Sequence, residues 1–143
     1  MVDITSKEAV YREAVAEGVI RLRPSTVKRI MEGRVEKGDT LSISRVAAIQ
    51  AVKKTPDILP LCHNIPITHV DVNYEFIGED RVKVVVRVKT TAKTGVEMEA
   101  LTGVSIALLN IWDMVKKYEK DERGQYPDTR IEHIRVLSKI KGK

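Results

Sequence analysis

The chain has 143 residues, of which 43% are hydrophobic and 31% are charged, a balance typical of one soluble globular domain. A net charge of +5 favours an anionic partner, such as nucleic acid or a phosphorylated small molecule. The single cysteine excludes an internal disulfide and suits a reducing compartment, and no apolar signal-peptide run opens the sequence. We therefore expect a cytoplasmic protein without a membrane partner.

The first half of the chain predicts one strand followed by two helices. Residues 12–23 alternate small or aliphatic side chains with Glu and Arg, and a period of two predicts a strand. A helix is predicted to start at Pro24 and stop at Gly33. A second helix runs from Thr40 and ends before Pro56. Because prolines lie near both ends of "LPLCHNIP", residues 59–66, this segment is predicted to be a constrained loop.

The second half predicts a hairpin, a long helix and a last strand. The expected elements are strands at 67–77 and 81–90, a helix within 94–117, a turn at 120–128, a strand at 129–140 and a mobile Lys-rich tail at 139–143. The order of elements predicts an α+β fold, a ferredoxin-like sandwich with a four-stranded antiparallel sheet and helices packed on one face. All of it fits one domain, 1–143.

The long helix is uncharged from Ala100 to Trp112, although charged residues bracket it. One stripe is enough to cover the sheet: Val104, Leu108 and Ile111. Other faces of the helix still carry Ile106, Leu109 and Trp112. Because little else in a chain of this size could cover them, we predict a homo-oligomer with a site at a subunit boundary.

The charges that bracket this helix are candidate functional groups. If the chain is extended at Glu97 and Glu99 and the helix starts after them, both carboxylates share a face and address one ligand. Asp113 and Lys116 are neighbours on a helix surface, and we expect perturbed pKa values there. The alternative for all four is an ordinary solvated charge or a helix-end ion pair.

Other kinds of site have weaker support. Cys62, His63 and His69 are the only clustered metal-ligand types, and their spacing does not match a structural zinc site. No Gly-rich phosphate loop ending in Lys and Ser or Thr is present. An RNA-binding module on the open sheet face is an alternative, but the strand aromatics are only Tyr74 and Phe76, so we predict no nucleic acid partner.

Five stretches resemble the molybdenum cofactor biosynthesis protein C family: "MVDIT", "KGD", "AAIQAVKKTPDILPLCHNIP", "KTGVEMEALTGVSIALLNIWDMVK" and "LSKIKGK". The resemblance runs from Met1 to Lys143. It implies a ferredoxin-like fold and a homohexamer, a trimer of dimers with active sites at subunit interfaces. The activity it implies is that of cyclic pyranopterin monophosphate synthase. This lyase converts (8S)-3′,8-cyclo-7,8-dihydroguanosine 5′-triphosphate to cyclic pyranopterin monophosphate and diphosphate during molybdenum cofactor (molybdopterin) biosynthesis.

The resemblance also implies roles, residue by residue. The catalytic residues that it implies are Asp113, Lys116 and Lys37. The substrate-binding residues that it implies are Leu61, Cys62, His63, Met98, Glu99, Glu97, Lys53, Arg12 and Lys139. No metal site and no cofactor are implied, although Mg²⁺ could accompany the substrate triphosphate.

These residue types suit the chemistry. A Lys beside an Asp can deliver and remove protons during ring opening and closure, cations can hold the diphosphate that leaves, and carboxylates can accept hydrogen bonds from a guanine-like ring. Two other function classes remain open at this point: an RNA-binding module, and a scaffold or regulator that keeps the fold without the activity.

Overall fold

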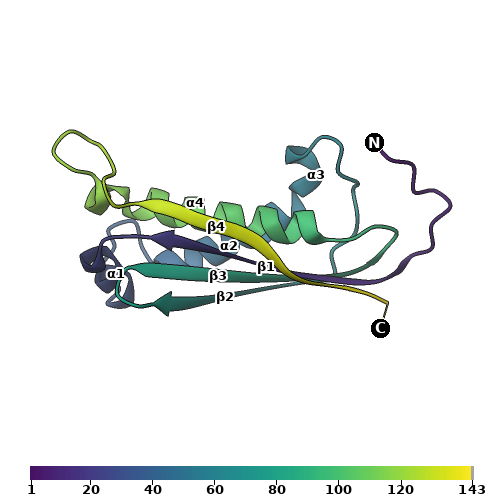
Figure 1. Ribbon diagram of the computed structural model, residues 1–143, viewed down its shortest axis with the longest axis horizontal. Helices are drawn as coiled ribbons and strands as arrows, with labels where there is room; N and C mark the ends of the chain where they lie inside the picture. The colour runs from purple at the N-terminus through teal and green to yellow at the C-terminus, as the bar shows by residue number, and fades with distance from the viewer. Residues whose placement is uncertain (143) are drawn as a thin grey trace.

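One antiparallel sheet carries the helices on one of its faces (Figure 1). The structure is a computed structural model that describes residues 1–142. Its elements are β1 (Val10–Arg21), α1 (Pro24–Met31), α2 (Thr40–Lys53), α3 (Thr55–Ile58), β2 (His69–Ile77), β3 (Arg81–Ala92), α4 (Glu97–Glu119) and β4 (Arg130–Lys141). The strand order β2-β3-β1-β4, antiparallel throughout, confirms the predicted ferredoxin-like α+β fold.

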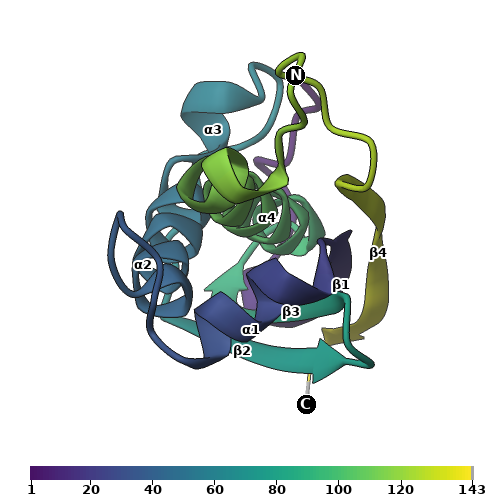
Figure 2. The ribbon, with the colours of Figure 1, turned by 90° about the vertical axis from the view of Figure 1, so that its left-hand side faces the viewer.

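The long helix α4 packs across the sheet beside α2 (Figure 2). The predicted stripe of Val104, Leu108 and Ile111 is fully buried, as expected from its spacing. Small residues on β1 let α4 lie close to the sheet, since a Cβ atom at Gly18 would come 2.6 Å from Val104 Cγ1. Leu109 on the opposite side is 52% exposed, which confirms that the sheet does not cover every apolar face of the helix.

The expectation that the second helix ends before Pro56 is confirmed, since α2 ends at Lys53. A short helix that was not predicted, α3, follows with this proline in its first turn, where the missing N–H costs nothing. Trp112 is not left for another subunit alone, since it makes an edge-to-face contact with Tyr126 at 5.1 Å between ring centres. By length and composition α4 could cross a bilayer, but half of its most apolar stretch is buried inside the protein, as in other core helices.

The helix-free face of the sheet is charged rather than aromatic. Glu13 and Glu17 lie on this face and are nearly buried by cations of the neighbouring strands, with Arg87 and Arg135 donating to them at 2.6 and 2.9 Å. Tyr74 lies on the other face, where its hydroxyl donates to Ser44 Oγ of α2 at 2.7 Å. The two aromatic residues expected in strands, Tyr74 and Phe76, thus pack toward the helices, away from the face on which an RNA-binding sheet would stack bases. Tyr11 of β1 lies on the helix-free face, with its hydroxyl donating to Glu13 at 2.7 Å.

Candidate active site

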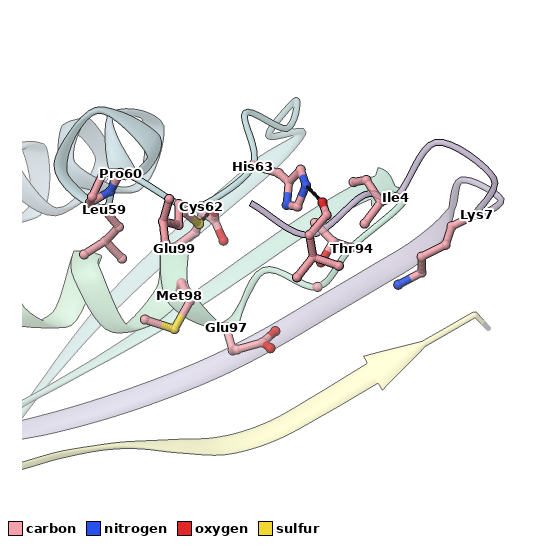
Figure 3. Close-up of a pocket in the computed structure, with 13 residues that line it drawn as sticks. Ile4, Lys7, Leu59, Pro60, Cys62, His63, Thr94, Glu97, Met98 and Glu99 are labelled. Carbon is pink, nitrogen blue, oxygen red and sulfur yellow. Dashed lines mark hydrogen bonds between the residues drawn. The ribbon is translucent and has the colours of Figure 1, made fainter.

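A cavity of about 630 Å³ opens where the loop after α3, the start of α4 and the N-terminal segment meet (Figure 3). Six of the nine predicted substrate-binding residues line it: Leu61, Cys62, His63, Glu97, Met98 and Glu99. The loop brings its three residues here because α3 turns the chain back over the N-terminal end of α4. Two segments that are distant in sequence thus form one site.

The two carboxylates at the start of α4 do not point the same way. The helix begins at Glu97, not after Glu99, so the expectation of an extended approach with both side chains on one face is wrong. Residues two apart on a helix diverge by about 200°. Accordingly, Glu99 turns toward the loop and Cys62, whereas Glu97 turns toward β4 and accepts a hydrogen bond from Lys139 Nζ at 3.2 Å. The two groups contact different parts of the cavity wall.

Glu99 is the buried acid of the cavity. The residue is only 1% exposed. Cys62 Sγ donates to Glu99 Oε2 at 3.8 Å, and Oε1 has no hydrogen-bond partner among residues 1–142. Burial raises the pKa of Glu99 above the usual range of a glutamate. Burial, reinforced by the nearby Glu99 carboxylate, also raises the pKa of the Cys62 thiol. The cavity therefore favours the protonated forms of Glu99 and Cys62. A hydrogen-bond donor of a ligand can pair with Glu99 Oε1.

A smaller cavity of about 130 Å³ adjoins the first one at Glu97 and carries cations. Arg12 lies on its wall, 9% exposed, with Nη2 donating to the Lys93 carbonyl at 3.3 Å and Nε unpartnered among the described residues. Lys139 is the first residue of the segment 139–143 that was expected to be a mobile tail. Residues up to Lys141 instead belong to β4 and pair with β1, and Lys143 lies outside the described residues. Three cationic residues, Arg12, Lys139 and Lys141, thus line this cavity together with two carboxylates, Glu13 and Glu97.

Asp113 forms a second cluster near the other end of α4. Its carboxylate accepts hydrogen bonds from Lys37 Nζ at 2.9 Å and Lys116 Nζ at 3.3 Å, and Lys37 also donates to the Asp113 carbonyl at 3.0 Å. The hydrogen bonds from Lys37 and Lys116 lower the pKa of Asp113. About half of each side chain remains exposed. This gathers all three predicted catalytic residues in one open cluster.

The three residues predicted to be catalytic do not reach the cavity of their own chain. Along α4, a rise of about 1.5 Å per residue separates the backbone positions of Glu99 and Asp113 by about 21 Å. The linings of the two cavities accordingly contain neither Asp113, Lys116 nor Lys37. Lys53, the last residue of α2, lines neither of them.

The N-terminal segment is part of the cavity wall, which the predicted site residues did not include. The Val2 carbonyl lies 2.7 Å from His63 Nε2, and the Thr5 carbonyl accepts from Lys93 Nζ at 2.9 Å. Val2, Ile4 and Lys7 line the cavity. The segment has no periodic pattern, so its place depends on tertiary contacts, and the family-like stretch "MVDIT" was the only signal that could have located it.

A protein-bound metal finds no ligand set here. Across residues 1–142, no group of three His, Cys, Asp or Glu side chains gathers closely enough to hold an ion. Cys62 and His63 are directed into the cavity beside Glu99. The expectation that no metal is needed stays a prediction.

Known proteins resemble this chain along nearly its whole length. A sequence model of the MoaC family matches residues 1–142. A protein of Pyrococcus abyssi is 60% identical over 99% of this chain and 88% of its own length, and one of Pyrococcus furiosus is 59% identical over 99% and 90%. One of Methanosarcina acetivorans is 59% identical over 99% and 89%. Each of the three is named probable cyclic pyranopterin monophosphate synthase.

Proposed function

The chain belongs to the MoaC family, and on that premise we propose that it is a cyclic pyranopterin monophosphate synthase. As a lyase of molybdenum cofactor biosynthesis, it converts the cyclised dihydroguanosine triphosphate to cyclic pyranopterin monophosphate and diphosphate. The structural observation that best supports this function is the cavity lined by Cys62, His63 and the buried Glu99.

The main cavity is proposed to hold the guanine-derived ring. A ring of this kind presents N–H and amino donors, and Glu99 Oε1 is a buried acceptor that lacks a partner among residues 1–142. Satisfying that oxygen removes the cost of leaving a buried acceptor unpaired. His63 offers a second polar contact once its ring leaves the Val2 carbonyl.

The smaller cavity is proposed to hold the phosphates. Arg12 and Lys139 supply positive charge there, with the unpartnered Arg12 Nε available to donate. A planar guanidinium suits phosphate oxygens, and fixed cations stabilise the diphosphate that leaves when a sugar hydroxyl attacks the α-phosphorus. Mg²⁺ would arrive with the triphosphate rather than on a site of the protein.

A second copy of the chain is proposed to complete each site. Asp113, Lys116 and Lys37 would transfer protons, yet they lie about 21 Å along α4 from the cavity of their own chain. Exposed apolar side chains offer surfaces for association, among them Leu109 of α4 and Ile134 and Ile140 of the edge strand β4. A two-fold partner would bring its Asp113 cluster to this cavity and receive the same in return. We propose a cytoplasmic homohexamer, a trimer of dimers with shared sites.

Subunit complementation tests both the activity and the sharing. Asp113→Ala and Glu99→Ala chains, each expected to be inactive alone, are co-expressed with different tags and purified together. Mixed dimers then contain one intact site of two, so random pairing restores about a quarter of the wild-type rate. The assay supplies the cyclised triphosphate and follows diphosphate and the fluorescent oxidised pterin. An active wild type without any restoration would refute the shared site, and an inactive wild type would refute the function.

Two other classes of function lose support. RNA binding is disfavoured because Tyr74 packs toward the helices, and salt-sensitive retention of RNA would revive it. A scaffold that has lost the activity has no need for a buried Glu99 whose Oε1 lacks a hydrogen-bond partner among residues 1–142. Turnover of the substrate by the purified chain would exclude that class.

A further inference from the structure

The loop that carries Lys37 has no regular structure of its own. It connects α1 to α2, and both Gly33 and Gly38 adopt positive φ angles, 67° and 122°. Glu36 and Lys37 are exposed, so the loop backbone gains little order from burial at these positions. Contacts with the neighbouring helix must therefore fix the direction in which Lys37 points.

The last turns of α4 supply those contacts. The hydroxyl of Tyr118 accepts a hydrogen bond from the backbone N–H of Glu36 at 2.9 Å. Lys117, the preceding residue of the helix, forms an ion pair with the Glu36 carboxylate. The Tyr118 ring is itself held in place, because it packs against the core and Arg29 stacks over it at 4.4 Å.

We propose that Tyr118 is a positioning residue for Lys37, its hydroxyl fixing the backbone next to Lys37 so that the ammonium reaches Asp113. This inference rests on the proposed function, in which Lys37 and Asp113 take part in proton transfer. Tyr118 touches neither the substrate nor the reacting atoms; it acts only through the loop. Lys117 assists with the weaker of the two contacts, because its pair with Glu36 is solvent-exposed and screened by salt.

The contact can matter for turnover while hardly affecting the fold. Val35 already anchors the loop in the hydrophobic core, 7% exposed, so loss of a hydrogen bond at the exposed Glu36 leaves the protein folded. Catalytic geometry is more demanding, since a misplacement of about 1 Å can lower a rate about a hundredfold. A change at Tyr118 should therefore appear in kcat rather than in stability.

The test compares Tyr118→Phe with Tyr126→Phe. The first removes the hydroxyl and keeps the ring on Arg29; the second removes a hydroxyl that makes no hydrogen bond within the described residues and lies near the same end of α4. We expect Tyr118→Phe to lower kcat about tenfold with KM within about twofold, and Tyr126→Phe to match the wild type. In a Lys37→Arg background, Tyr118→Phe should cause no further loss. An equal loss in both backgrounds, or an unchanged kcat, would overturn the proposal.

A second readout does not depend on turnover. Acetic anhydride labels the lysine amines of the folded protein. Digestion and mass spectrometry then report the labelling rate of Lys37. Freed from Tyr118, the loop should open more often and release Lys37 Nζ from Asp113, so labelling in Tyr118→Phe should be about threefold faster than in Tyr126→Phe. Equal rates would overturn the positioning role. If the wild type showed no turnover, the proposed function would fail while this comparison still tested the contact.

Discussion

Each end of α4 carries an acidic residue, and the two acids lie in opposite environments. At the start, Glu99 is buried beside Cys62, and burial raises the pKa of its carboxyl. Near the end, Asp113 is half exposed between Lys37 and Lys116, and their hydrogen bonds lower its pKa. The Asp113 carboxylate is paired with two cations and open to water, so it needs no further partner. The buried Glu99 has an oxygen without a hydrogen-bond partner among residues 1–142, and a ligand could supply one. The first end therefore suits the proposed binding of a ligand, and the second end suits the proposed transfer of protons.

The largest effect is expected from the exposed end. Asp113→Ala or Lys116→Ala should lower kcat by about a thousandfold, because each removes a proton-transfer group. The free energy of unfolding should barely change, since the cluster is solvent-exposed. Product assays and chemical denaturation measure the two quantities. The exposed Lys120 is a matched control, and Lys120→Ala should keep full activity. Normal product formation by either site variant would remove these residues from catalysis.

The next effect concerns the surface between the two ends. Leu109 lies midway along α4 and is 52% exposed, so Leu109→Glu should leave the protomer folded but place a charge where we expect a partner. Light scattering should then report smaller assemblies, and activity should fall with assembly size. The exposed Val46 of α2 provides a comparison in the form of Val46→Glu. An intact and fully active assembly of the Leu109 variant would contradict the shared site.

The smallest effect sharpens the contrast in pKa. Because the pKa of Glu99 is raised in the folded state, its ionisation costs stability as pH rises from the ordinary glutamate range through the raised value. Glu99→Gln removes that cost, so the variant should be no more stable than the wild type near pH 4 and relatively more stable near pH 8, by about 1 kcal/mol for each pKa unit of the shift.

Asp113→Asn should show the opposite trend with a much smaller amplitude, because the Asp113 carboxylate is solvent-exposed. The stabilisation that comes from its lowered pKa is present above the ordinary aspartate range and is lost as pH falls through the lowered value. Urea unfolding at several pH values measures both variants. A stability difference between Glu99→Gln and the wild type that does not depend on pH would argue against a buried acid with a raised pKa.

The fold could be predicted almost completely from residue periodicity. The stripe of Val104, Leu108 and Ile111 identified the buried face of α4, because that pattern follows directly from helix geometry. The alternation in β1 identified a strand but not its exposure, since both faces of β1 are buried. The alternative start of α4 after Glu99 lies three residues beyond its actual start at Glu97. The N-cap position is Val96, which makes no side-chain cap hydrogen bond that could mark the boundary.

The site could be predicted less well. Family resemblance located Cys62, His63 and Glu99, and the structure brings these three together. The distance of Asp113 from Glu99 follows from the rise of the predicted helix. Sequence patterns did not show that Val2 would contact His63, because that contact does not follow from local periodicity. The pairing of Trp112 with Tyr126 was missed for the same reason, since the turn that carries Tyr126 has no pattern to fix its path.

The distance between the ends of one stiff helix has a kinetic consequence. A lone chain would hold the nucleotide and the proton donors on separate surfaces, so catalysis would be a property of encounters between molecules. Upon dilution below the dissociation constant of the assembly, the rate would fall with the square of the amount of protein rather than in proportion to it. As the protein accumulates, the rate of pterin synthesis would then rise more steeply than the amount of protein, and expression level would control it disproportionately.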